Sequence, residues 1–90
     1  MRRIVYRPSA LEALVAIHDY IAVDDPHAAK RVVAGIRNSI SYLAQFEYMG
    51  RPGVVPNTRE LVVPRSRYIV AYEIREDIEI IKIYHGRQVS

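Results

Sequence analysis

Residues that could transfer protons lie in the second half of the chain. Tyr84 and His85 are adjacent near its end, and Glu60 precedes them. Among the three, His85 alone has an ordinary pKa close to neutrality, so it is the first candidate for moving a proton at physiological pH. The three side chains could act as general acid and base if the fold brought them to one place.

Arginine carries almost all of the positive charge. Lys30 and Lys82 are the only lysines among 13 basic residues, and the net charge is +3. A guanidinium binds carboxylate and phosphate groups through a planar fork, so these side chains suit an acidic partner or a nucleic acid. The cations near the proton-transfer candidates in sequence are Arg51, Arg59, Arg65, Arg67 and Arg87. Each of them could equally be an ordinary solvated charge.

Plainer structural roles compete with these assignments. His85 could simply end a strand and hydrogen-bond a loop carbonyl. Arg59 and Glu60 are neighbours, so in a strand their side chains point to opposite faces and cannot act as one pair. Tyr68 and Tyr72 share a face, which favours a place in the core over base stacking. The three histidines fall in separate elements without ligand spacing, so no metal site and no cofactor is predicted.

Length and composition indicate one small domain, residues 1–90. A chain of this size buries roughly 60% of the surface that its unfolded form exposes, so a partner could contribute to its stability. No apolar run approaches the roughly 18 residues of a membrane span, and the N-terminus lacks the apolar stretch of a signal peptide. Because there is also no cysteine, we expect a cytoplasmic protein without disulfides.

A first helix is predicted directly after a short strand at residues 4–7. Pro8 ends this strand, and Ser9 with Glu12 matches a capping box. The apolar residues that follow recur at helical spacing, and they are Leu11, Leu14, Val15, His18, Ile21 and Ala22.

A second helix follows after a tight turn. Asp25 is placed to cap it, and Pro26 stands at the first helical position, where its missing N–H is not needed. Its apolar stripe consists of Ala29, Val32, Val33, Ile36, Ile40 and Leu43. Gly35 costs about 1 kcal/mol relative to alanine in mid-helix, so we expect a close approach of the first helix there. The short connection requires an antiparallel hairpin.

The apolar pattern changes to a period of two after a loop at residues 48–58. Strands are predicted at residues 59–63, 68–74 and 78–84, and short turns between them imply an antiparallel meander. The expected fold is α+β with two layers: an N-terminal strand, and a helical hairpin packed on a mainly antiparallel sheet of three to four strands. The last strand has apolar residues at both odd and even positions, which predicts burial on both faces or docking against a partner.

Four segments, in order, resemble the RelE/ParE family of type II toxins. Residues 17–29 contain YIAVDDPHAA, similar to the family's "YIA-x-D-x-P-x-AA" signature. Residues 50–53 and 58–63 are similar to its "GRPG…TREL" segment. Residues 68–72 resemble its "YIVVY" strand, and residues 84–88 its closing "HGxR/Q".

The resemblance implies a growth-arresting toxin of a plasmid-stabilisation toxin–antitoxin system. A cognate antitoxin made beside it would wrap and neutralise it, and operon DNA would be bound only through that antitoxin. ParE-branch members are similar to proteins that poison DNA gyrase. RelE-branch members are ribosome-dependent mRNA interferases, so the resemblance leaves open whether the chain is an enzyme.

Two branches imply different site residues. An interferase activates a ribose 2′-oxygen and stabilises the resulting phosphorane, for which the candidates are His85, Tyr84, Glu60, Arg59 and Arg65. A gyrase poison needs no catalytic residue, and its target-binding candidates are Arg51, Arg65, Arg67 and Arg87. The ParE branch is favoured because the second half of the chain has a single lysine, Lys82, and ends soon after His85.

The antitoxin is expected on apolar surface that so small a chain cannot hide. The helix-hairpin groove and a free sheet edge are the expected places, because sheet edges invite strand addition. The candidate residues are Leu14, His18, Ile21, Val33, Ile36 and Ile40.

Overall fold

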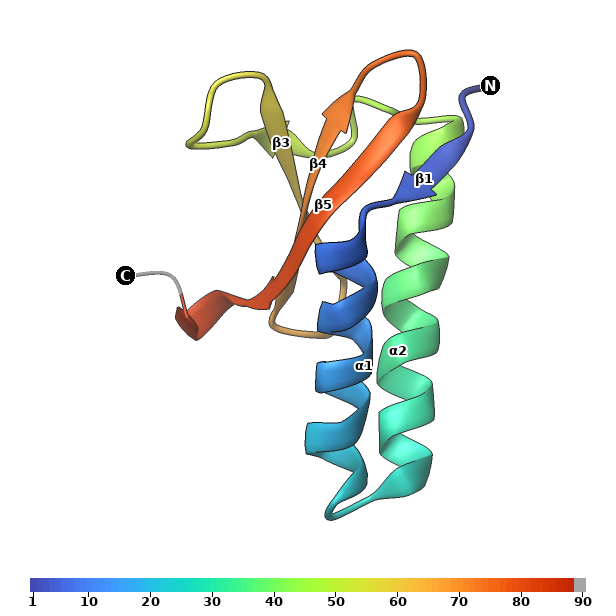
Figure 1. The fold of residues 1–90 in the computed structure, drawn as a ribbon, viewed down its shortest axis with the longest axis vertical. Helices are drawn as coiled ribbons and strands as arrows, with labels where there is room; N and C mark the ends of the chain where they lie inside the picture. Colours follow the sequence, from blue (N-terminus) through green and yellow to red (C-terminus); the bar gives the residue numbers. More distant parts are fainter. Residues whose placement is uncertain (89–90) are drawn as a thin grey trace.

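Two helices cover one face of a five-stranded sheet in the computed structural model, which describes residues 1–88 (Figure 1). The helices are α1 (Pro8–Ala22) and α2 (Pro26–Ser41), and a short 3-10 turn, Tyr42–Ala44, extends α2. The strands are β1 (Ile4–Tyr6), β2 (Arg51–Pro52), β3 (Thr58–Val62), β4 (Tyr68–Ile74) and β5 (Ile78–His85), and a second 3-10 turn, Gly86–Gln88, follows β5.

The sheet has the strand order β1-β5-β4-β3-β2. β1 pairs with β5 in parallel, and the remaining neighbours are antiparallel. The predicted two-layer α+β fold is therefore confirmed, including the helical hairpin on a mainly antiparallel sheet. The sheet is wider than expected because β2 forms inside the segment predicted as a loop.

The start of α1 differs from its prediction. The helix begins at Pro8, and Arg7 is its N-cap residue in extended conformation without a side-chain cap. Proline at the first helical position has its φ angle already set for the helix, so no capping box is needed. The Ser9 hydroxyl instead donates to Ile81 O at 2.6 Å, which ties α1 to β5.

The buried stripe of α1 is rotated from the predicted one. Ala10, Leu14 and Ile17 are buried, whereas Leu11 and Val15 are exposed on the outer side of the helix. The i, i+4, i+7 spacing of the buried set is that of a single helical face. Sequence periodicity alone allowed both stripes, because alanine at position 10 carries little hydrophobic signal.

The start of α2 is as predicted, but the close approach of α1 that was expected at Gly35 is not found. Asp25 Oδ1 accepts hydrogen bonds from the amides of His27 at 3.1 Å and Ala28 at 3.0 Å, and Pro26 opens the helix. Gly35 is exposed, and apart from its chain neighbours and the adjacent helix backbone no atom lies within 4 Å of the place where its Cβ would be. The glycine therefore does not mark a close approach of α1.

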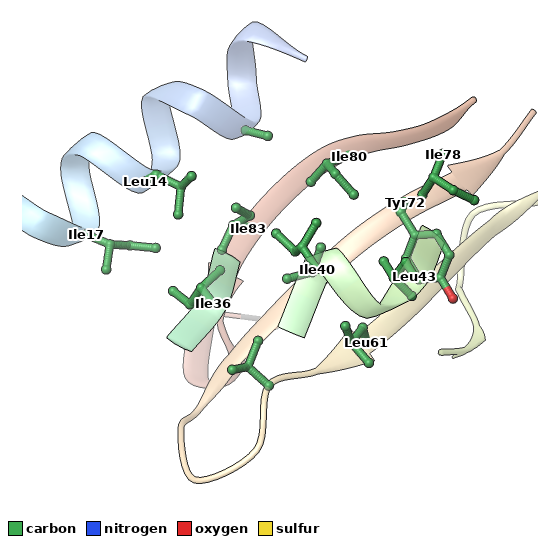
Figure 2. Close-up of a cluster of buried hydrophobic side chains, with 13 residues drawn as sticks. Leu14, Ile17, Ile36, Ile40, Leu43, Leu61, Tyr72, Ile78, Ile80 and Ile83 are labelled. Atoms are coloured by element: carbon green, nitrogen blue, oxygen red, sulfur yellow. The ribbon is translucent and has the colours of Figure 1, made fainter. Parts of the chain in front are cut away.

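The core lies between the helical hairpin and the sheet, as Figure 2 shows. Leu14 and Ile17 on α1 and Ile36 on α2 point toward the sheet, whose strands contribute Tyr72 and Ile80 to the same cluster. Fully burying one such aliphatic side chain contributes about 1.5–3 kcal/mol. Tyr72 is wholly buried, as predicted, and Tyr68 packs at the edge of the cluster.

A bulge explains the mixed apolar pattern of β5. Tyr72 pairs with Ile80 and Ala71 pairs with Lys82, so Ile81 is the extra residue on β5. Such an insertion shifts the alternation by one position, and Ile80 and Ile83 can both face the helices. Both are buried, while Ile81 is half-buried. Apolar residues at both odd and even positions of β5 therefore reflect this bulge, which shifts the positions that face the helices.

The buried Tyr72 hydroxyl holds the segment between α2 and β2. It donates to Glu47 O at 2.7 Å and accepts from the Gly50 amide at 3.0 Å. A Cβ on Gly50 would stand 2.7 Å from this hydroxyl and 2.8 Å from Glu60 O, so the close approach requires glycine. The segment is thus fixed to the sheet through its backbone.

Candidate functional site

The sheet face that the helices leave uncovered carries a row of side chains in register. Arg51 pairs with Glu60, Glu60 with Ala71, and Ala71 with Lys82 across β2, β3, β4 and β5. Directly opposed residues point to the same face of a sheet. Glu60 Oε1 accepts from Arg51 Nε at 3.3 Å and Nη2 at 3.2 Å. Small Ala71 leaves the middle of the row open.

Tyr84 joins this row from β5. Its hydroxyl lies 3.4 Å from Glu60 Oε2, and Lys82 Nζ lies 5.3 Å from the centre of its ring. Burial raises the pKa of Tyr84, and the charge and hydrogen bond of Glu60 raise it further. Tyr84 is thus a neutral donor toward a carboxylate, placed between two cationic side chains, Lys82 and Arg51.

Arg59 points to the opposite face from Glu60, as predicted. Its guanidinium donates to Gly50 O from Nε at 3.0 Å and to Tyr48 O from Nη2 at 3.4 Å. The same group lies over the Tyr48 ring, 5.2 Å from its centre. Arg59 therefore holds the segment before β2, and the interferase set loses one of its cations to a structural role.

His85 faces the helical side of the sheet, where its partner across the ladder is Tyr68. The two rings meet edge to face at 5.4 Å and 85°. His85 Nδ1 accepts the amide hydrogen of Arg87 at 3.1 Å. Tyr84 and Glu60 lie on the other face, so the structure does not bring the three proton-transfer candidates together.

Three of the four target-binding candidates gather at one end of the sheet. Arg65 and Arg67 lie in the exposed turn between β3 and β4, and Arg87 follows β5. The Gly86 amide donates to Arg67 O at 2.6 Å, which joins the turn to the end of β5. Arg65 has a φ of 61°, in the left-handed region. Arg51 lies apart from this end, in the row with Glu60.

The residues predicted to bind an antitoxin are only in part accessible at the surface. Ile36 and Ile40 are fully buried against the sheet, so the prediction is wrong for these two side chains. Leu14 is nearly buried but still lines a shallow groove between α1 and α2 with His18 and Val33. Apolar periodicity marks the face a helix buries, and here that face is already covered by the domain's own sheet. His18, Ile21 and Val33 remain half-buried, with His18 Nδ1 3.2 Å from Asp19 Oδ1.

Beyond Leu11 and Val15 on α1, exposed apolar side chains also lie around the segment that follows α2. They are Tyr42, Phe46, Tyr48 and Met49. Val62 on β3 is exposed beside Tyr42 and Met49, and the three line a groove between α2 and β3. The sequence offered one signal for this surface: four large apolar residues in a stretch without regular periodicity.

Within residues 1–88, no helix has the length and apolar character that a membrane span requires. No group of three or more histidine, aspartate or glutamate side chains in that range is arranged to hold a metal ion.

Comparison with known proteins identifies the family. The profile described as "ParE toxin of type II toxin-antitoxin system, parDE" matches residues 4–90. This chain belongs to the ParE toxin family. The ParE-family chain is also 44% identical over 87 residues to a Sinorhizobium fredii protein named "Putative toxin Y4kP", covering 97% of this chain and 91% of that protein.

Two further relatives bear on the fold and on the branches of the family. The chain is 31% identical over 90 residues to a Caulobacter vibrioides protein named "Toxin RelE2", covering 99% of this chain and all of that protein. A solved structure titled "Chromosomal ParDE TA system from P. aeruginosa" superposes with a TM-score of 0.86 at 27% identity, covering 94% of this chain and 96% of that one. The family resemblance predicted from the four sequence segments is therefore confirmed.

Proposed function

We propose that this ParE-family toxin inhibits DNA gyrase by binding and is neutralised by a cognate antitoxin. The observation that carries the gyrase proposal is the separation of His85 from Tyr84 and Glu60 on opposite faces of the sheet. Arg59 is engaged with the backbone of Tyr48 and Gly50. The interferase set predicted from the sequence is thus divided between two faces, which favours a toxin that acts by binding.

The basic end of the sheet is the surface proposed to contact gyrase. Arg65, Arg67 and Arg87 are exposed there and can each bind a carboxylate or phosphate through a bidentate fork. The backbone hydrogen bond between Gly86 and Arg67 fixes the relative position of the turn and the segment after β5. Both the toxin and its target would act in the cytoplasm.

A second candidate function, cleavage of mRNA on the ribosome, is favoured by a different observation. Glu60, Tyr84, Arg51 and Lys82 converge on the uncovered face, so a carboxylate, a phenol and two cations lie together without His85. One relative carries the RelE name. In this alternative, Glu60 would act as the base and the cations would stabilise the phosphorane.

Induction of the chain in a bacterial host separates the two functions. We expect growth arrest with an SOS response and intact transcripts, and loss of DNA supercoiling by purified gyrase when the toxin is added. Codon-positioned cuts in translated mRNA, without any effect on gyrase, would contradict the proposal and support the alternative. Absence of any growth effect would indicate a relative that has lost toxicity.

Charge reversal tests the proposed contact surface. Replacing Arg65 and Arg67 together by glutamate should abolish gyrase inhibition, while Glu60→Gln and Tyr84→Phe should leave it intact. The matched control is Arg31→Glu, since Arg31 is exposed on α2 and belongs to neither surface. Equal inhibition by the Arg65/Arg67 variant and by the control would rule out the basic end as the contact.

A further inference from the structure

A cavity of about 730 Å³ opens between the second half of α1 and the end of β5. β1 pairs with β5 only as far as Ile80, and beyond that point β5 runs away from the helical hairpin, which extends past the sheet (Figure 1). Ala13 and Ala16 form the helix wall, and their small side chains leave the space open. The volume lies within the roughly 300–1,000 Å³ that is typical of small-molecule sites.

Three aromatic rings from three separate elements line this cavity. They belong to Tyr20 at the end of α1, Tyr68 on β4 and His85 on β5. The Tyr68 and His85 rings are held edge to face, with their centres 5.4 Å apart. Burial raises the pKa of Tyr68, and the electrostatic effect of Tyr20 raises it further, so the two phenols lie close enough to interact. Tyr20 is 81% exposed, so its ring is open to a ligand.

Arg87 gives the cavity its positive charge. Among the lining residues that the structure describes, it is the one arginine or lysine, and none of them is a carboxylate. Its amide donates to His85 Nδ1 at 3.1 Å, and the Gly86 amide donates to Arg67 O at 2.6 Å, so the backbone that carries Arg87 is fixed. A guanidinium in a wall without carboxylates favours an anionic ligand.

The combination of rings and cation distinguishes between classes of ligand. A free phosphate would contact Arg87 and leave the three rings uncovered, and an aliphatic ligand would not use the cation. A nucleotide uses both, because every base has a flat π-face that stacks on an aromatic side chain and its phosphate is negatively charged. The base must be unpaired to enter the cavity, since a duplex keeps its bases inside the stack.

We propose that this cavity binds an unpaired nucleotide, with the base against Tyr20 and Tyr68 and the phosphate on Arg87. A free nucleoside phosphate and an unpaired position in a strand present the same chemistry. The inference goes beyond the proposed function, because it adds a nucleotide site beside the basic end of the sheet. Its binding is measured on the toxin alone, without gyrase, ribosome or antitoxin.

Calorimetric titration of the full chain with three probes tests the ligand class. The probes are adenosine monophosphate, a short oligodeoxyadenylate and inorganic phosphate. We expect an adenine probe to bind at least about tenfold more tightly than inorganic phosphate. A monophosphate that binds as tightly as the strand identifies a free nucleotide as the ligand, whereas binding of the strand alone identifies an unpaired strand.

Variants of the exposed lining residues test the site. Tyr20→Leu should raise the Kd of the adenine probe about tenfold. Arg87→Met should raise it by a similar factor and reduce its dependence on salt. The matched controls are Tyr42→Leu and Arg31→Met, since both residues are exposed and neither lines the cavity. Their Kd values should equal that of the wild type, and circular dichroism should show the same fold in all four variants.

NMR of the labelled aromatic rings locates the base. Stacking should shift the ring signals of Tyr20, Tyr68 and His85 when the adenine probe is added. Tyr48 is the internal control, because it is exposed in the segment before β2 and outside the cavity, and its signals should stay in place.

Three results would overturn the inference. The first is that no adenine probe binds with a Kd below about 1 mM. The second is that inorganic phosphate binds as tightly as the nucleotides, which would remove the role of the base. The third is a nucleotide Kd that neither Tyr20→Leu nor Arg87→Met raises. Gyrase inhibition is scored separately, so its failure would leave each of these binding results interpretable.

Discussion

The Tyr84 hydroxyl lies 3.4 Å from Glu60 Oε2, across the intervening strand β4 and on the face away from the helices. Tyr84 and its neighbour His85 therefore serve different surfaces, although they are adjacent in sequence. Tyr84 belongs to the row with Arg51 and Lys82, while His85 packs against Tyr68. This division underlies the preference for a binding toxin over a catalytic one.

Removing the charge of Glu60 should lower the pKa of Tyr84. Burial remains the main cause of the raised pKa, and the Glu60 charge is the next. Glu60→Gln should therefore shift the titration of Tyr84 toward its ordinary value without restoring it fully, as followed by NMR of the labelled tyrosine ring. An unchanged titration would show that burial alone raises the pKa.

Alkaline pH should destabilise the fold. Burial is the main cause that raises the pKa of Tyr6, Tyr68 and Tyr84 in the folded state. A tyrosine in the unfolded chain has a pKa of about 10. The contribution of these neutral tyrosines to stability is therefore complete below that pH, and it is lost as the pH rises through their higher pKa values in the folded state. Urea unfolding at increasing pH should show a falling free energy of unfolding, with a shallower fall for Tyr84→Phe.

Tyr72→Phe should destabilise the domain by about 1–3 kcal/mol, because it leaves the Gly50 amide and the Glu47 carbonyl without their partner. Chemical denaturation measures the loss. Tyr42→Phe is the matched control, since Tyr42 is exposed and its change should stay within about 0.5 kcal/mol. Equal effects in the two variants would mean that solvent replaces the Tyr72 hydrogen bonds.

Alanine at two of the glycines should change stability in opposite directions. At Gly50 the new Cβ would meet Tyr72 Oη at 2.7 Å and Glu60 O at 2.8 Å, and overpacking of this kind costs about 1–3 kcal/mol. At Gly35 nothing lies within 4 Å, so Gly35→Ala should stabilise α2 by about 0.5–1 kcal/mol. Thermal unfolding of both variants would check the signs, and a stabilising Gly50→Ala would contradict the described contact.

Arg7 should be coupled to the two carboxylates that it bridges. Its Nη2 lies 2.7 Å from Glu73 Oε1 and 2.8 Å from Glu79 Oε1, two residues that are neighbours across β4 and β5. Arg7→Met should lower the free energy of unfolding by about 1–2 kcal/mol, which lies between the losses typical of exposed and of buried ion pairs. A double-mutant cycle with Glu79→Gln should give a coupling of about 0.5–2 kcal/mol that weakens in high salt. Additive losses would show that Arg7 acts only through packing.

Several features could be predicted because their causes are local. Asp25 caps α2, and Pro26 opens it, through contacts within one turn. Arg59 and Glu60 point to opposite faces because strand geometry requires it. Other predictions failed because a distant residue decided them: Ser9 bonds to Ile81 in place of a cap, and Gly35 faces open space, away from α1.

The sequence by itself determined the family, the order of helices and strands apart from β2, and the burial of Tyr72 in the core, since these depend on periodicity, turn residues and motif spacing. Only the tertiary structure decided which side chains share a surface. The bulge at Ile81 changes the register of β5, and β2 forms only where Arg51 reaches Glu60. Strand pairing joins residues far apart in the chain, so it alone could bring Tyr84 to Glu60 and place His85 against Tyr68.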